Sequence, residues 1–362
     1  MDDRDDLKYW LGLSLVGGLG PKIFRSLYTH FGSARAIWEA RETELLSLGL
    51  SERVLDSLTE VKNKGVEGEL ERVRSLGIKL IRFTDKEYPG NLKKISSPPF
   101  LLYTKGEILP RDELSLAVVG TRKFTDYGKR ATAKIVGDLA SSGLVIVSGL
   151  ALGIDSAAHR AALEVGGRTI AVLGHGLDQV YPPENWELAF KISKSGALVS
   201  EFPLGFPPVS GNFPARNRII AGLSLGTLVC EAPEKSGALI TASQTTEEGR
   251  PVFALSGSIF SPQSVGTARL VQDGAKLIVS AEDILSELDV KARSVGIKAR
   301  EIIPETEEES AILKSLGDDL LYVDEICRRS ELSAAKVSST LTEMGIKGMV
   351  EELGGGRWAV KK

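Results

Sequence analysis

From Leu114 onward, short apolar runs alternate with longer amphipathic stretches. Unbroken apolar runs are typical of parallel strands that are buried on both faces, and amphipathic stretches are typical of the helices that cover them. The predicted strands are Leu116–Val119, Leu144–Val147, Thr169–Leu173, Ala197–Ser200, Thr227–Cys230, Val252–Ala254 and Leu277–Val279. The predicted helices include Tyr127–Ser142, Ser156–Val165 and Gly237–Glu248. This alternation predicts an α/β fold with a doubly wound, Rossmann-like, mostly parallel sheet.

The chain before this region divides into two parts. Residues 7 to about 75 have the spacing of short helices, and a glycine-rich turn at Gly17–Lys22 separates two of them. We therefore expect an N-terminal helical domain over residues 1–80, of the SAM or helix-hairpin-helix kind. A helix-hairpin-helix would offer backbone N–H groups to a DNA phosphate, although a small packing module is the favoured interpretation. Residues 85–110 are rich in loop-forming residues and contain one short predicted strand, Phe100–Tyr103.

A charged segment leads from the Rossmann-like domain, predicted over residues 85–288, to a final small domain. Lysines, arginines and glutamates accumulate over residues 289–309, which we interpret as a solvated linker. In residues 310–362 we expect three helices followed by a hairpin, which together make a winged helix. The helices are Ile312–Leu316, Val323–Arg328 and Ala335–Met344, and the hairpin strands are Met349–Leu353 and Arg357–Val360.

The charge of the winged-helix domain bears on its role. Residues 305–362 carry 12 acidic and 8 basic side chains, a net charge of −4. A domain that reads DNA is expected to be basic. We therefore favour a protein–protein role for this domain over DNA binding.

The composition of the whole chain narrows the possible functions. Its 362 residues carry a formal net charge of −3, so nucleic-acid binding requires a local basic patch. The two cysteines, Cys230 and Cys327, lie in different predicted domains, which disfavours a disulfide framework and fits a reducing cytoplasm. The acidic start, Met1–Asp6, predicts no secretory signal, and no apolar run approaches the length of a membrane span. We expect a cytoplasmic protein with no membrane partner.

The segment Phe213–Ser224 combines two arginines with a predicted helix start. Asn212 is a candidate N-cap, and the Arg-Asn-Arg triplet Arg216–Arg218 falls in the first turn or two of the helix. A helix start already carries partial positive charge and unpaired N–H groups, so arginines there call for an anion. A bound phosphate would supply it. The alternative is that these arginines pair with Glu201 or Glu231.

Four glycine-bearing turns follow predicted strands, at Val119–Arg122, Ser148–Asp155, Leu173–Asp178 and Glu231–Thr241. In an open parallel sheet the carboxyl ends of the strands lie on one edge, where ligands bind. Glycine lets the backbone approach a phosphate closely, helix starts supply N–H donors, and arginine grips phosphate oxygens with two donors. We therefore expect one polyanion groove. Its predicted nucleic-acid-binding residues are Gly120, Thr121, Arg122, Ser148, Gly149, Gly174, Arg216, Asn217, Arg218, Ser236 and Gly237.

Common enzyme motifs are missing or misplaced. There is no P-loop motif and no strict G-x-G-x-x-G after the first strand, so no nucleotide cofactor and no catalytic residue is expected. Gly222–Gly226 matches G-x-S-x-G, but a helix precedes it and a strand follows, which is the wrong order for a nucleophile elbow. His159 and His175 lack the carboxylate or cysteine companions of a metal site. His159 is predicted to be packed in the core, and His175 lies in a turn from which it could touch a ligand.

Several residues near the predicted groove have two interpretations. Asp155 is expected to cap the following helix, with an acid close to the ligand as the alternative. Glu231 would either orient the arginines or act as a catalytic carboxylate. Tyr181 and Trp186 would either stack on a nucleobase or cover the edge of the sheet.

Taken together, these motifs resemble those of the DNA-processing protein A family (DprA, also called Smf). The resemblance spans roughly residues 88–284, and its motifs fall in the same order. They are Val119–Arg122, Ser148–Asp155, Tyr181–Asn185, Phe213–Ser224 and Ser236–Ala242. The helical N-terminal module and the winged-helix tail also fit the three-part layout of that family.

The resemblance implies a bacterial cytoplasmic protein that binds single-stranded DNA entering during natural transformation. It implies that the protein loads the RecA recombinase onto that strand, works without nucleotide hydrolysis, and forms a homodimer through the Rossmann-like domain. Carried over by motif, Arg122 would contact the DNA backbone, Ser148 and Gly149 would offer donors, Arg216–Arg218 would line the groove, and Ser236-Gly237 would close it.

One departure from the family pattern concerns a phosphate contact. Many relatives carry a lysine at the third position of the Tyr-Pro-x-Glu-Asn motif, where this chain has Pro183. The contact is then either missing or supplied elsewhere, with Lys191 as a candidate.

The sequence is compatible with three hypotheses about function. The first is a non-catalytic single-strand binder whose affinity depends on salt and on the arginines. The second is an enzyme like the nucleotide phosphoribohydrolases of related Rossmann-like folds, with Glu231 as its carboxylate. The third is an interaction scaffold without DNA affinity.

Overall fold

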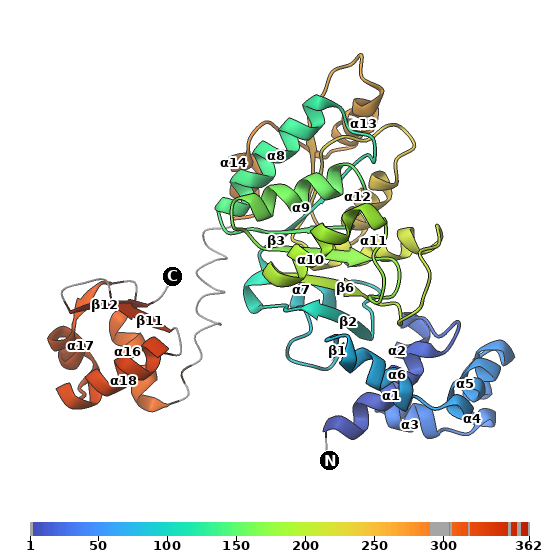
Figure 1. Ribbon diagram of the computed structural model, residues 1–362, viewed down its shortest axis with the longest axis horizontal. Helices are drawn as coiled ribbons and strands as arrows, with labels where there is room; N and C mark the ends of the chain where they lie inside the picture. The colour runs from blue at the N-terminus through green and yellow to red at the C-terminus, as the bar shows by residue number, and fades with distance from the viewer. Residues whose placement is uncertain are drawn as a thin grey trace. The chain divides into compact units, whose positions relative to one another are not determined.

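Each apolar run predicted as a strand between residues 116 and 279 forms a strand of one sheet in the computed structural model (Figure 1). Two antiparallel strands, β1 (Lys79–Arg82) and β2 (Leu101–Gly106), extend one edge of the sheet. The parallel strands are β3 (Ser115–Val119), β4 (Val145–Ser148), β5 (Thr169–Leu173), β6 (Ala197–Ser200), β7 (Thr227–Val229), β8 (Val252–Leu255) and β9 (Lys276–Ile278). The order across the sheet is β1-β2-β6-β5-β4-β3-β7-β8-β9. The predicted doubly wound, mostly parallel sheet is confirmed.

The structure describes residues 3–289, 304, 306–317, 319–346, 349–352 and 356–360. It divides into two compact units, Met1–Lys291 and Ala292–Lys362. Most of the predicted linker, residues 289–309, lies outside the described residues.

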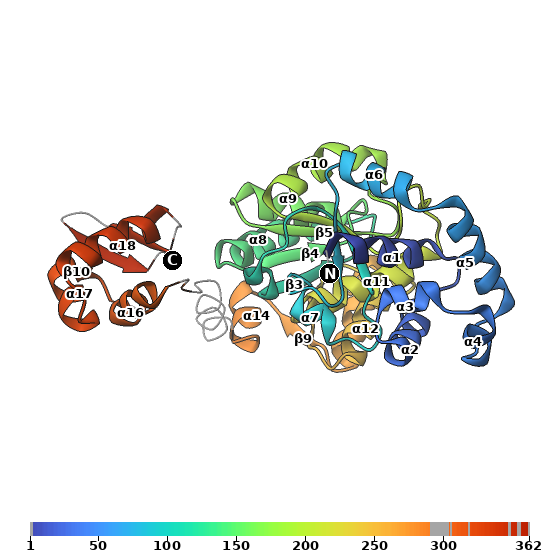
Figure 2. The same ribbon diagram turned by 90° about the horizontal axis from the view of Figure 1, so that it is seen from below.

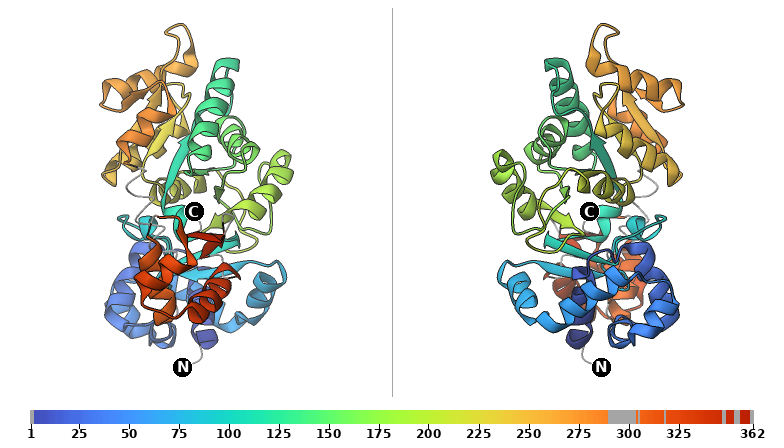
Figure 3. Two further views of the ribbon diagram at one scale, coloured as in Figure 1. Left: turned by 90° about the vertical axis from the view of Figure 1, so that its left-hand side faces the viewer. Right: turned by 90° about the vertical axis from the view of Figure 1, so that its right-hand side faces the viewer.

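Helices cover both faces of the sheet because successive residues of a strand point to opposite sides. In β3, Leu116 and Val118 enter the core beneath α8 (Asp126–Ser141), α9 (Ile154–Glu164) and α14 (Ala281–Glu287). Ala117 and Val119 enter the opposite core, beneath α7 (Gly90–Lys93), α11 (Asn212–Leu223) and α12 (Gly237–Glu247). Figure 3 shows these two helical layers, with α10 (Trp186–Ser195) beside α9 and α13 (Val265–Gln272) on the opposite layer. Burial on both faces explains why the strands are apolar without alternation.

The direction of winding reverses between β3 and β7. From β3 the chain proceeds through β4 and β5 to β6, and it then returns through α11 to β7, which pairs with β3. It continues outward to β8 and β9 on the other side. The loops that follow β3 and β7 therefore leave the sheet in opposite directions, and such a switch point is where open α/β sheets bind ligands.

The N-terminal helices pack against the antiparallel edge of the sheet (Figure 2). They are α1 (Asp3–Leu15), α2 (Pro21–Phe31), α3 (Ala34–Glu39), α4 (Glu42–Ser47), α5 (Glu52–Lys64) and α6 (Glu67–Ser75). The rings of Phe24 and Phe100 stack with their centroids 4.0 Å apart. The hydroxyls of Ser14 and Tyr103 lie within hydrogen-bond distance, at 2.8 Å. These helices therefore share one core with β2, β5 and β6.

The second unit has the helices and hairpin of a winged helix. Its elements are α16 (Glu307–Leu316), β10 (Leu321–Tyr322), α17 (Val323–Ser330), α18 (Ala334–Ile346), β11 (Val350–Glu352) and β12 (Arg357–Val360). The hairpin strands pair antiparallel as predicted, and β10 adds a third strand that is too short to leave a sequence pattern. α16 starts before the predicted Ile312 because Thr306 caps it: the Glu309 N–H donates to the Thr306 hydroxyl oxygen at 3.1 Å.

His159 is packed in the core, as predicted. It lies fully buried on α9, with Nδ1 2.6 Å from the hydroxyl oxygen of Thr169. Burial, reinforced by the positive charge of Arg216, lowers the pKa of His159 from 6.5 to about 3. The folded state therefore holds this imidazole neutral at physiological pH.

We expect this histidine to make the protein acid-sensitive. Above pH 6.5 the imidazole is neutral in both the folded and the unfolded state, so this group does not reduce stability there. As the pH falls from 6.5 towards 3, only the unfolded chain binds the proton, and the free energy of unfolding decreases. Between about pH 7 and about pH 5 the wild type should lose about 2 kcal/mol more unfolding free energy than His159→Asn, which does not titrate. Urea denaturation of both proteins at the two pH values measures the difference. Equal losses in the two proteins would show that His159 is not the responsible group.

Candidate nucleic-acid interface

A pocket of about 300 Å³ opens at the switch point, where β3 and β7 end. Its walls come from the loops that follow β3, β4 and β7 and from the helices α11 and α12. The lining residues are Val119, Gly120, Thr121, Arg122, Ala151, Asp155, Phe213, Arg216, Asn217, Ile220, Pro233, Lys235, Ser236, Gly237, Ala238 and Thr241. Seven of the eleven predicted site residues are among them: Gly120, Thr121, Arg122, Arg216, Asn217, Ser236 and Gly237.

Two glycines allow these loops to pack closely. A Cβ on Gly120 would lie 2.9 Å from the carbonyl oxygen of Glu231. Gly153 has a φ of +87°, and a Cβ there would collide with the backbone of Thr121. The Ile154 N–H donates to the Thr121 carbonyl at 3.1 Å, which ties the start of α9 to the β3 loop. The loops that follow β3, β4 and β7 therefore pack closely against one another at these two glycines.

Arg216 forms the floor of the pocket. It is almost fully buried, and its guanidinium donates to the carbonyl oxygens of Val172 and, at 2.8 Å, of Gly149. Its Nε donates to the Asn217 side-chain oxygen at 3.2 Å. Burial lowers the pKa of Arg216 to about 10, so it stays charged at neutral pH. One buried cation thus holds the ends of β4 and β5 together and places positive charge beneath the pocket.

Asp155 is the acid that faces this cation. The predicted capping role is wrong, because the N-cap of α9 is Gly153 and Asp155 lies inside the first turn. One carboxylate oxygen accepts from the backbone N–H groups of Gly149, at 3.2 Å, and Ala151, at 3.4 Å. Burial raises the pKa of Asp155, and the charge of Arg216 opposes that shift. Asp155 lines the pocket, as its alternative interpretation proposed.

The predicted cap of α11 is also wrong. The helix starts at Asn212, and Gly211 is its N-cap. The Asn212 side chain instead donates to the carbonyl oxygens of Gly174, at 3.1 Å, and Pro207, at 3.2 Å. It therefore joins the loops that follow β5 and β6 to the start of the helix.

The open side of the pocket is cationic. Arg122 is exposed, and its guanidinium carbon lies 5.6 Å from the centroid of the Phe213 ring. The guanidinium carbon of Arg216 lies 5.8 Å from the same centroid, so both cations contact one aromatic ring. Lys235 is exposed on the β7 loop. Next to it α12 begins with Ser236 as its N-cap and has no acidic residue in its first turn. Exposed cations beside an uncompensated helix start make an anion site.

Four predicted residues do not line the pocket: Ser148, Gly149, Gly174 and Arg218. The Ser148 hydroxyl is buried and donates to the Val118 carbonyl at 2.6 Å. Arg218 pairs with Glu201 and donates to the Ser97 carbonyl at 2.7 Å, as the alternative interpretation of the arginines proposed. Residues two apart on a helix point in different directions, so Arg216 and Arg218 cannot face the same pocket.

Glu231 does not orient the arginines. Its buried carboxylate accepts from the Thr125 N–H at 2.9 Å and from the Thr125 hydroxyl at 2.6 Å. A side chain on Gly128 would collide with it. The role of Glu231 is therefore to hold the start of α8 against the β7 loop, and its carboxylate does not line the pocket.

Of the two aromatic side chains considered for base stacking, Tyr181 lies beside the pocket. Tyr181 is half-exposed, with its ring 6.2 Å from that of Phe213. Trp186 is 65% exposed and stacks on Phe190. The Asn185 side chain before it donates at 2.8 Å to the carbonyl of Leu150, in the β4 loop.

Lys191 and His175 do not line the pocket. Lys191, the candidate replacement for the family lysine, pairs with Glu187 at 2.7 Å on α10. Lys235 lines the pocket instead, and sequence reasoning missed it. The available signal was its place directly before the cap of α12. His175 is buried and is not among the lining residues.

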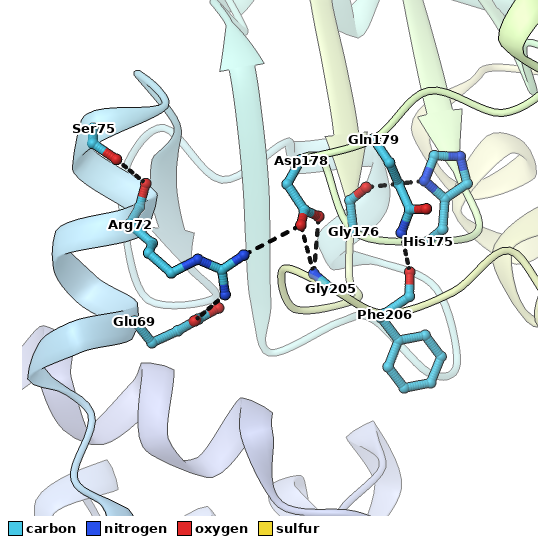
Figure 4. A network of polar contacts seen from close by, with 9 residues as sticks. All are labelled: Glu69, Arg72, Ser75, His175, Gly176, Asp178, Gln179, Gly205 and Phe206. Atoms are coloured by element: carbon cyan, nitrogen blue, oxygen red, sulfur yellow. Dashed lines mark hydrogen bonds and ion pairs between the residues drawn. The ribbon is translucent and has the colours of Figure 1, made fainter.

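The N-terminal helices brace the loops that follow β5 and β6 (Figure 4). Arg72 on α6 bridges Glu69, at 3.0 Å, and Asp178, at 3.3 Å. Both carboxylate oxygens of Asp178 accept from the Gly205 N–H at 2.9 Å. Gln179 donates to the Phe206 carbonyl at 2.8 Å. The helical module thus contacts loops at the carboxyl ends of the parallel strands, which is also the end of the strands at which the pocket opens.

Within the described ranges, no three histidine, cysteine, aspartate or glutamate side chains gather as a metal site. Across the same residues, no helix has the length and apolar character needed to span a bilayer.

The chain is similar to known proteins over nearly its whole length. Residues 79–289 match the family described as DNA recombination-mediator protein A, and residues 298–356 match the DprA winged helix domain. Protein Smf of Synechocystis sp. is 36% identical to it, over 97% of this chain and 98% of that protein.

Two solved structures share the fold. DNA processing protein A from Streptococcus pneumoniae matches with a TM-score of 0.69 and 37% identity, over 77% of this chain and 97% of that one. DNA processing protein A from Helicobacter pylori, described for its unique single-stranded DNA binding mode, matches with a TM-score of 0.54 and 31% identity. That match covers 59% of this chain and 96% of the other.

Proposed function

Because the chain belongs to the DNA recombination-mediator protein A family, also called DprA or Smf, we propose that it binds single-stranded DNA at the pocket between β3 and β7. The observation that carries the proposal is the meeting of Arg122, Lys235 and the start of α12, whose first turn has no acidic residue, above the buried Arg216. The similar protein from Helicobacter pylori is described as a single-stranded DNA binder, which supports the same ligand here.

In this proposal a phosphate of the strand lies at the start of α12. Its oxygens accept from the backbone N–H group of Gly237 and from the side chains of Arg122 and Lys235, while the Ala238 N–H stays bonded to the Ser236 hydroxyl. The bases stack on exposed rings beside the pocket, of which Tyr181 is best supported, because its ring lies 6.2 Å from that of the pocket-lining Phe213. Contacts to the backbone and to ring faces do not depend on base identity, so the binding is sequence-tolerant.

We propose a non-catalytic role in preference to a phosphoribohydrolase. Such an enzyme needs a carboxylate beside the substrate, and Glu231 was its candidate. The hydrogen bonds of Glu231 to Thr125 turn it towards α8, away from the pocket-lining residues. Asp155 is the acid that lines the pocket, and its carboxylate is engaged by two backbone N–H groups and faced by Arg216.

The proposed function also includes a cellular location, a protein partner and an oligomeric state. We propose that the protein acts in the cytoplasm during natural transformation and loads the RecA recombinase onto the bound strand. The acidic winged-helix domain favours a protein partner over DNA for that unit. We propose a homodimer through β9, the edge strand of the sheet, where Leu277 on the strand and Val279 directly after it are exposed.

The ligand is tested with a fluorescent oligothymidine and a duplex of equal length. The single strand should bind more tightly, and the logarithm of its affinity should fall linearly with the logarithm of salt concentration, by about 0.7 for each phosphate neutralised. Affinity that does not change with salt would contradict the proposed site. Release of free base from nucleoside monophosphates, lost in Glu231→Gln, would favour the enzyme instead.

The partners need separate measurements. Light scattering should give a mass twice the 38.9 kDa of the chain, and Leu277→Asp should reduce it to a single copy. The protein should also shorten the lag before RecA assembles on a single strand that is already coated with a single-strand-binding protein. An unchanged lag would remove the loading role while leaving DNA binding intact.

A further inference from the structure

The loop between β8 and α13 ends in an apolar tip made of Ile259 and Phe260. These two side chains are 91% and 89% exposed, the highest values among the large apolar residues of the described chain. In Figures 1 and 3 this loop projects beyond α8 and α13. Each such side chain left in water forgoes the free energy that burial would supply. Two adjacent ones at the end of a loop therefore indicate a surface that is covered by a partner.

The loop is braced so that the tip is held outward. The Phe260 N–H donates to the Ser258 hydroxyl oxygen at 3.2 Å, and the Ser261 N–H donates to the Ser258 carbonyl at 3.0 Å. On the side of α8, the Tyr127 hydroxyl donates to the Ser256 carbonyl at 2.7 Å. A tight turn and an anchored base thus present the two apolar side chains in a defined direction.

The base of the loop is joined to the wall of the pocket. The Ala232 N–H donates to the Gln263 carbonyl at 2.8 Å, and the Gly266 N–H donates to the Ala232 carbonyl at 2.7 Å. Ala232 lies three residues before Lys235, which lines the pocket. β8 is also parallel to β7 and adjacent to it, so both loops leave the same edge of the sheet.

Charge around the loop favours a polyanion as the occupant. The first turns of α8, to which Tyr127 anchors the loop, carry exposed Lys129 and Arg130. Of the nearby acids, Glu234 is paired with Arg269 at 3.0 Å, and Asp126 lies at the start of α8. Exposed aromatic rings among cations are what proteins offer to single-stranded nucleic acids, because every unpaired base has a face that stacks.

We propose that Phe260, supported by Ile259, is a second base-stacking contact for the single strand after it leaves the pocket. This inference rests on the proposed DNA-binding function and extends its site along the edge of the sheet from β7 to β8. A duplex would not use the tip, since its bases are already stacked on one another.

The test compares a short oligothymidine of about 4 nucleotides with a long one of about 16, a range that covers the site sizes of single-strand-binding folds. Phe260→Ala should weaken binding of the long strand about 5- to 100-fold and leave the short one unchanged, while Phe260→Trp restores the long-strand affinity. The control Leu46→Ala removes an exposed apolar side chain from α4 and should change neither affinity. A long strand carrying 5-iododeoxyuridine should cross-link to Phe260 under ultraviolet light.

Three outcomes would contradict the proposed role of Phe260, and each points to a different cause. If Phe260→Ala binds both strands like the wild type while Arg122→Ala weakens both, the tip is not a DNA contact and the pocket stands. If Phe260→Ala changes the mass of the protein in solution and not its affinity, the tip is a protein interface and the inference is overturned. If the wild type binds neither strand, the proposed function fails and this inference fails with it.

Discussion

Replacing Arg122 with alanine is expected to weaken single-stranded DNA binding about 5- to 150-fold, which corresponds to about 1–3 kcal/mol for a hydrogen bond to a charged group. The side chain is exposed at the mouth of the pocket, where it packs over Phe213. Its loss removes one phosphate contact, so the salt dependence of binding should also become shallower by about 0.7 on the log–log scale. Fluorescence anisotropy at several salt concentrations measures both quantities.

A matched control separates this effect from a change in net charge. Arg35 lies exposed on α3 of the N-terminal module, where it pairs with Glu39 at 2.9 Å. Arg35→Ala removes the same charge and should leave affinity and salt dependence unchanged. If both variants lose affinity equally, the binding reflects overall charge rather than the pocket. An unchanged affinity in Arg122→Ala would show that the strand binds elsewhere.

Arg216→Ala is expected to lower the free energy of unfolding by about 3–5 kcal/mol, as when one partner of a buried charge pair is removed. The guanidinium holds the carbonyls of Gly149 and Val172 and faces the buried Asp155. Its removal leaves both carbonyls and a carboxylate without their positive partner in the core. Urea denaturation gives the value.

A double variant tests whether the pair is the cause. Asp155→Asn combined with Arg216→Met removes both charges and nearly preserves the volume, so it should be less destabilised than the sum of the two single variants. Strict additivity would mean that the two groups do not interact. DNA binding of the folded double variant would then report how much the buried positive charge contributes to affinity beyond Arg122 and Lys235.

Much of the fold could be predicted because the relevant patterns are local. Strands buried on both faces must be apolar throughout, and the glycines and caps that follow them mark their carboxyl ends. The elements that escaped prediction were too short to carry a pattern, as with β1, which has only two buried residues, and the two-residue β10. Two expected helix caps were wrong because Asn212 and Asp155 bond to neighbouring loops instead of to their own helices.

The sequence predicted which segments meet at the pocket better than it predicted the roles of their side chains. Arg122, Arg216 and Ser236 come from three distant segments, and they meet because parallel strands end at the same edge and the winding reverses between β3 and β7. Their side-chain roles differ, and no local pattern shows this. Arg216 lies under the pocket, Arg218 pairs with Glu201, and Lys235 completes the cationic rim.

By itself, the order of apolar and polar residues determined the parallel sheet, the edge at which its strands end and the segments that reach this edge, because these follow from backbone geometry and burial. The tertiary structure alone decided which charges face the pocket. That choice depends on the rotation of each helix about its axis and on the carbonyls and carboxylates it meets, as the different partners of Arg216 and Arg218 show. Such partners come from elsewhere in the chain, so no stretch of sequence contains them.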